Sequence, residues 1–128
     1  MVLTTTLCFA AACAIINTWL AMRISPLRQA HGISVGDGGN ELLARRMRAQ
    51  LNFVENTPWV LALVAGIELA GRGGRVLPVV AAVYVLARVA HPFGMDGKVR
   101  SARTVGTLLT TTIQIALAIW AVTIAAGW

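Results

Sequence analysis

Two cations, an amide and a carboxylate recur at helical spacing near the middle of this chain. They are Arg45, Arg48, Asn52 and Glu55, separated by three, four and three positions. On an α-helix this spacing places all four side chains, called here the polar stripe, on one face. Guanidinium groups suit carboxylates and a carboxylate suits an ammonium group, so the polar stripe is suited to a zwitterionic ligand. The alternative is a structural ion pair in which Arg48 and Glu55 neutralise each other.

A second set of residues has the spacing four, three and four: Tyr84, Arg88, His91 and Met95. His91 directly precedes Pro92, which is typical of a helix end or a kink. It is therefore either a polar cap or a functional imidazole. Arg88 is expected to pair with a carboxylate, for which Glu55 and Asp96 are the available choices.

Arg100, Arg103 and Thr104 open the last apolar segment of the chain. Cations at this position either anchor a helix at the membrane interface or act on a ligand. The functional interpretation is that one of these arginines stabilises a bound thiolate, because a nearby cation lowers the pKa of a thiol. Arg46 falls off the face of the polar stripe and is expected to anchor in lipid headgroups.

Apolar segments must position these residues, because the chain of 128 residues is 57% hydrophobic and 12% charged. A soluble domain carries about 25% charged residues. We therefore predict an all-α integral membrane protein, a single domain over 1–128 whose spans cover about 2–22, 41–70, 76–95 and 104–128. A signal peptide is the alternative for the first segment, but that segment has no cation before Arg23.

The boundaries of the second segment follow from local signals. Asn40 is available as an N-cap, so the second helix is expected to begin near Asn40–Glu41. The stretch from Ser25 to Gly39 holds one Pro and four Gly and predicts an irregular loop.

Nine of the eleven Lys and Arg residues lie around the first and third connections, and only Arg72 and Arg75 lie near the second. The positive-inside rule then places both termini outside and the basic loops in the cytoplasm. The chain has no basic run with interleaved aromatic residues, so no nucleic-acid partner is predicted. Cys8 and Cys13 have no ligand partners at metal spacing and are expected to be small packing residues, so no metal is predicted.

Several segments together resemble one family of membrane proteins. Residues 45–58 are similar to the second-helix signature of the MAPEG family (membrane-associated proteins in eicosanoid and glutathione metabolism). Residues 36–39 resemble the loop that precedes this helix in bacterial members of the family. Residues 87–91 resemble the end of the family's third helix, and residues 97–100 with 103–104 resemble the loop that follows that helix. The resemblance covers nearly the whole chain in length, number of spans and order of motifs.

The resemblance implies a four-helix bundle that assembles as a homotrimer, here in a bacterial inner membrane. It implies a glutathione-dependent transferase or peroxidase, with glutathione as co-substrate between subunits and a lipophilic electrophile or lipid hydroperoxide entering from the bilayer. The matching glutathione-binding positions are Arg48, Asn52, Glu55, Arg45, His91, Arg23 and Arg88. The positions implied to act on the thiolate are Arg103, Arg100 and Thr104.

One position departs from the family pattern. Eicosanoid-pathway members have a Tyr four residues after the His, where this chain has Met95, and Tyr84 lies about three turns away. This argues against a prostaglandin or leukotriene activity. Two alternatives to the enzyme remain, a lipid-binding scaffold of the same fold and a small multidrug-resistance-like transporter. Such transporters carry their key Glu in the first span, which is uncharged here.

Overall fold

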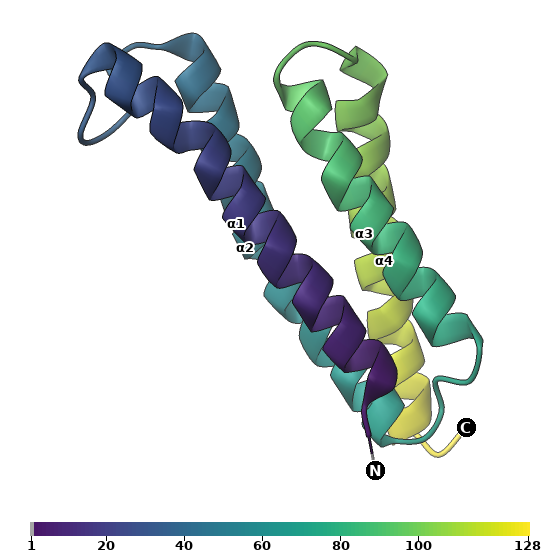
Figure 1. The fold of residues 1–128 in the computed structure, drawn as a ribbon. Helices are drawn as coiled ribbons and strands as arrows, with labels where there is room; N and C mark the ends of the chain where they lie inside the picture. Colours follow the sequence, from purple (N-terminus) through teal and green to yellow (C-terminus); the bar gives the residue numbers. More distant parts are fainter. Residues whose placement is uncertain (1) are drawn as a thin grey trace.

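The chain folds into four long helices joined by short connections. The computed structural model describes residues 2–128, except for the side chain of Arg100. The helices are α1 (Thr4–His31), α2 (Glu41–Leu69), α3 (Val76–Met95) and α4 (Arg100–Ala125). They run alternately up and down, with α1 beside α2 and α3 beside α4 (Figure 1). The prediction of an all-α four-helix bundle is confirmed.

The composition of these helices is that of an integral membrane protein. Within the described residues, α1, α3 and the Ser101–Ala125 part of α4 are long and apolar enough to cross a membrane. The polar stripe occupies the first half of α2. Figure 1 shows both termini and the α2–α3 connection at one end of the bundle. The connections 32–40 and 96–99, which adjoin most of the cations, lie at the other end, called here the basic end.

The predicted start of α2 is confirmed by its cap. Asn40 is extended, and its side-chain oxygen accepts a hydrogen bond from the backbone N–H of Leu43 at 2.9 Å. This bond satisfies one of the amides that the first turn of a helix leaves free.

The predicted irregular loop over 25–39 is wrong in its first part. Helix α1 continues through Pro26 and ends at His31, where Gly32 adopts a φ of 63°. Pro26 removes only one backbone hydrogen bond. On either side of Pro26, Ile24 is buried and Arg28 donates to the sulfur of Met47 on α2. The irregular connection therefore covers only residues 32–40.

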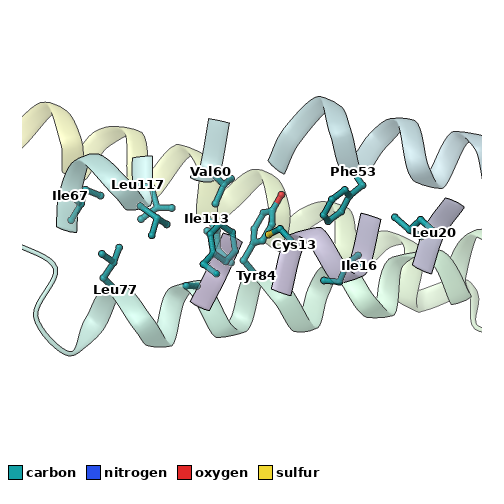
Figure 2. Close-up of a cluster of buried hydrophobic side chains, with 13 residues drawn as sticks. Cys13, Ile16, Leu20, Phe53, Val60, Ile67, Leu77, Tyr84, Ile113 and Leu117 are labelled. Atoms are coloured by element: carbon teal, nitrogen blue, oxygen red, sulfur yellow. The ribbon is translucent and has the colours of Figure 1, made fainter. Parts of the chain in front are cut away.

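Buried apolar side chains from all four helices meet along the bundle axis (Figure 2). On α1 the buried positions recur every three or four residues, at Phe9, Cys13, Ile16 and Leu20. Phe9 packs edge-on against Tyr84 with ring centroids 5.5 Å apart. Cys13 is a packing residue as predicted, whereas Cys8 is exposed on the bundle surface, which corrects the prediction for that residue.

Two glycines allow α3 and α4 to approach closely at the basic end. A Cβ atom on Gly94 would lie 2.1 Å from the backbone nitrogen of Arg103, and one on Gly106 would lie 2.9 Å from Cβ of His91. Both distances are far below van der Waals contact. The absence of a side chain at these positions therefore sets where His91 and Arg103 lie.

Glu68 holds α1 and α2 together at the opposite end. Its carboxylate accepts hydrogen bonds from the backbone N–H groups of Thr5 and Thr6 at 2.8 and 2.7 Å, and from the Thr6 hydroxyl at 2.6 Å. These are amides of the first turn of α1, where a negative charge also complements the helix dipole.

Candidate functional site

The polar stripe divides into outward-facing and inward-facing residues. Arg45 pairs with Glu41, one turn earlier on α2, at 2.5 Å. Arg48 and Glu55 lie 3.9 Å apart on the outer surface, and their side chains are 59% and 47% exposed. This separation is too long for a hydrogen bond, which needs about 2.7–3.2 Å between N and O. The two charges are neighbours that remain accessible to a ligand.

Asn52 turns inward and meets Arg88. Nη1 of Arg88 donates to the Asn52 side-chain oxygen at 2.9 Å and to the Thr110 hydroxyl at 3.2 Å. The guanidinium also lies over the ring of Phe53, 5.5 Å from its centroid. The Arg88 residue is only 1% exposed.

The prediction that Arg88 pairs with a carboxylate was wrong. Within the described residues no ion pair joins Arg88 to Glu55 or Asp96. Glu55 faces outward beside Arg48, and Asp96 is bound by other cations. The buried charge is stabilised instead by an amide, a hydroxyl and an aromatic face, which are ordinary partners for guanidinium.

Asp96 is the centre of a buried ionic cluster between α1, α2 and the end of α3. Its side chain, 4% exposed, pairs with Arg23 and lies 3.6 Å from Nη2 of Arg46. Nη1 of Arg46 also donates to the backbone oxygen of Arg23 at 2.7 Å. Arg46 is therefore not a free headgroup anchor, and that prediction was wrong. The acceptor is a backbone oxygen of α1, and a helical-wheel projection of α2 alone does not show it.

Arg23 is held from several directions. In addition to Asp96, its guanidinium lies 5.0 Å from the Trp19 ring centroid and 5.8 Å from that of Phe93. This arrangement fixes the cation at the basic end of the bundle.

His91 on α3 and Arg103 on α4 both adjoin the close α3–α4 contact. His91 is buried, with its Nδ1 atom enclosed and without a hydrogen-bond partner among the described residues. Arg103 and Thr104 are exposed on α4. Within the described part of one chain, no hydrogen bond or ion pair joins Arg103 to the outward residues of the polar stripe. Arg100 begins α4, but its side chain lies outside the described structure.

Sequence reasoning missed a groove between α1 and α2 at the basic end. It has a volume of about 660 Å³ and includes Arg28, Asp37 and Arg48 in its lining. Ala21, Ile24, Ser25 and Arg28 form one helical face only if the helix continues through Pro26. The 3.0 Å hydrogen bond between Thr57 and Tyr84 was missed too, because nothing local connects residues on different helices.

Comparison with known proteins agrees with this architecture. The sequence model of the MAPEG family matches residues 6–123, and so includes almost all of the four helices. No curated protein matches the chain.

Proposed function

Because the chain belongs to the MAPEG family, which includes glutathione-dependent transferases and peroxidases, we propose that it is a membrane-bound enzyme of this kind. Its substrates would be lipophilic electrophiles or lipid hydroperoxides. The observation that carries the proposal is the Arg48–Glu55 pair, 3.9 Å apart and about half exposed on the outer face of α2. Charges in a membrane bundle are costly and commonly mark a ligand site.

The chemistry of this pair fits the ends of glutathione. Its carboxylates suit the planar fork of Arg48, and its ammonium group suits Glu55. Both side chains point away from their own bundle, so we propose that a neighbouring subunit of a homotrimer covers them and completes the site. Arg45, Asn52, His91, Arg23 and Arg88 are proposed to line or support the same site from α1, α2 and α3.

Arg103 and Thr104 are proposed to act on the thiol, together with Arg100. A cation beside the sulfur favours loss of the thiol proton to water and stabilises the thiolate. In the transferase reaction the thiolate forms a carbon–sulfur bond and displaces the leaving group with its electron pair. In the peroxidase reaction it attacks the outer oxygen of the hydroperoxide and the O–O bond breaks. The lipid leaves as an alcohol after protonation, and a second glutathione converts the sulfenic acid to disulfide and water.

The membrane contributes to the rate by confining both reactants. A lipophilic substrate concentrates in the bilayer beside the basic end, where the thiol is held. Orientation of two reactants in one site is worth about 7–11 kcal/mol in favourable cases.

Glutathione binding to the detergent-purified protein tests the site directly. We expect isothermal calorimetry to show binding to the wild type and a loss of at least about tenfold in Arg48→Ala, because a charge-assisted contact is removed. Arg75→Ala is the matched control, since Arg75 is an exposed cation at the opposite end. Absence of glutathione heat with a folded wild type would instead favour a lipid-binding scaffold.

A further inference from the structure

Asp96 makes the ionic contacts between the two halves of the bundle. Helices α1 and α2 form one antiparallel pair and α3 and α4 the other, and the two pairs diverge toward the basic end (Figure 1). Among the described residues, both ion pairs that cross from one half to the other are made by Asp96, with Arg23 on α1 and Arg46 on α2. One carboxylate therefore joins three helices at the basic end.

This carboxylate belongs to the last turn of α3. The backbone N–H of Asp96 donates to the oxygen of Pro92 at 3.0 Å, and that of Gly97 donates to the oxygen of Gly94 at 3.2 Å. Gly97 also lies against α2, because a Cβ atom there would be 3.1 Å from Nη1 of Arg45. The Asp96 side chain is 4% exposed, so its position is set by the protein around it. Where the carboxylate is held, the end of α3 is held too.

The end of α3 in turn sets the start of α4. Gly94, two residues before Asp96, lies where the backbone of Arg103 approaches too closely for any side chain. Arg103 is the exposed cation proposed to stabilise the thiolate. On α2, Arg46 comes two residues before Arg48, which is proposed to hold the peptide. Asp96 therefore links the segment that binds the peptide to the segment that acts on its sulfur.

We propose that Asp96 is a positioning residue for Arg103. Held by the two arginines of the ionic cluster, its carboxylate fixes the start of α4 relative to α2. A displacement of about 1 Å at a reacting centre can lower a rate about 100-fold, so a small movement of α4 is sufficient to affect turnover. This role rests on the proposed function, because it belongs to the same thiol chemistry.

Asp96→Asn removes the charge and keeps an oxygen acceptor for Arg23. Arg46, at 3.6 Å, is beyond hydrogen-bond distance and is attracted by the charge alone, so its link to α3 should be lost. We expect kcat with a model aryl halide to fall at least about fivefold, whereas the glutathione Kd from calorimetry should change less than about threefold. Asp96→Glu restores the charge and should recover most of the turnover.

The protonation state of the bound thiol reports on Arg103 directly. The ultraviolet absorbance of the thiolate, followed against pH, should show that the pKa of bound glutathione is higher in Asp96→Asn than in the wild type, because the cation has moved from the sulfur. Glu68→Gln is the matched control, since it neutralises a carboxylate that joins α1 and α2 at the opposite end. It should lower stability and leave the thiol pKa unchanged.

The placement of α3 and α4 can be measured without glutathione. Leu42 on α2 and Lys98 in the 96–99 connection are both exposed. Spin labels on Leu42→Cys and Lys98→Cys, with both native cysteines replaced by Ala, measure the distance between the two halves. We expect a broader distance distribution in Asp96→Asn. If that variant does not fold, Arg46→Gln leaves the Arg23–Asp96 pair in place and should give the same broadening and the same rise in thiol pKa.

Three outcomes separate this role from its alternatives. A folded Asp96→Asn with the kcat, thiol pKa and distances of the wild type would overturn the proposal. A loss of glutathione affinity with kcat retained would overturn it too, because Asp96 would then act on binding through Arg23. Both results leave the proposed enzyme standing. A wild type that does not bind glutathione would instead overturn the proposed function, and the catalytic role of Asp96 with it.

Discussion

Arg88 shows how this bundle holds a charge in its interior without a carboxylate. Nη1 of its guanidinium donates to Asn52 and Thr110, and the group lies over the face of Phe53; these partners come from α2 and α4. Burying a charge is costly unless it is hydrogen-bonded, so these partners make the α2–α3–α4 contact dependent on one side chain. Asn52 is thereby a structural residue of this chain in addition to its proposed place near glutathione.

The first prediction concerns Asn52. Asn52→Leu should lower the free energy of unfolding by roughly 1.5–3 kcal/mol, because Nη1 of Arg88 loses an acceptor in a buried site. Asn52→Asp retains an oxygen acceptor and adds a counter-charge, so it should be close to the wild type. Thermal unfolding in detergent, followed by circular dichroism, compares the variants. Equal stability of the Leu variant and the wild type would mean that Arg88 does not depend on this hydrogen bond.

The second prediction concerns Arg103, whose proposed role is on the sulfur and not on binding. Arg103→Ala should lower kcat by about tenfold or more while KM for glutathione changes little, because the thiolate loses a stabilising cation. Steady-state assays with a model aryl halide and a model organic hydroperoxide measure both constants. Exposed Lys98→Ala, in the adjoining connection, is the control. A rise in KM with kcat preserved would assign Arg103 to binding instead.

At the scale of elements, the close approach of α3 and α4 depends on glycine at Gly94 and Gly106. An added Cβ at Gly94 would meet backbone atoms of α4, which cannot move without shifting the whole helix. Overpacking of this kind typically costs about 1–3 kcal/mol. The same contact positions Arg103, so a shift there should reach the proposed catalytic group.

The third prediction follows from that contact. Gly94→Ala should destabilise the protein by about 1–3 kcal/mol and reduce turnover. Gly66→Ala is the matched control, since Gly66 lies within α2 with no atom near an added Cβ. Replacing glycine in a helix interior should stabilise by about 0.5–1 kcal/mol. Chemical unfolding of both variants checks the sign. Stabilisation by Gly94→Ala would show that the two helices are further apart than described.

At the scale of the whole molecule, the fold separates the connections by charge. The basic end contains both connections flanked by most of the cations, and the termini lie with Arg72 and Arg75 at the other end. Arg72 donates to the backbone oxygen of Trp128 at 2.5 Å, which holds the C-terminus beside the α2–α3 connection. We propose from the charge asymmetry that the basic end faces the cytoplasm and the termini face outside.

The fourth prediction tests this orientation. In a background with Cys8 and Cys13 replaced by Ala, Val35→Cys and Lys98→Cys should react with an impermeant thiol reagent only from the cytoplasmic side. Trp128→Cys should react only from outside; all three positions are exposed. Reaction of Val35→Cys and Lys98→Cys on different sides would contradict the up-and-down arrangement. Reaction of all three on reversed sides would overturn the orientation alone.

The fifth prediction concerns assembly. If Arg48 and Glu55 are covered by a neighbouring subunit, native mass spectrometry from detergent should give three times the chain mass of 13.6 kDa. Glutathione should then stabilise the assembly against dissociation, because it would contact both subunits. A monomer that binds glutathione with full affinity would place the whole site within one chain.

The amino-acid sequence by itself determined the elements and the outward part of the site. Long apolar segments require helices in a bilayer, because every backbone polar group must be satisfied within its own segment. The Asn40 cap is equally local, and so is the spacing that brings Arg48 and Glu55 to one face. These features depend on residues within a few turns of one another.

Only the tertiary structure decided which partners the interior charges take. Arg88 donates hydrogen bonds to Asn52 and Thr110 and does not pair with a carboxylate. Arg46 lies beside Asp96 and does not extend into the lipid headgroups. The same packing let α1 continue through Pro26 and so placed Arg28 in the groove. These partners depend on contacts between helix faces that lie tens of residues apart in the sequence. A local sequence pattern does not contain the free energy of such contacts.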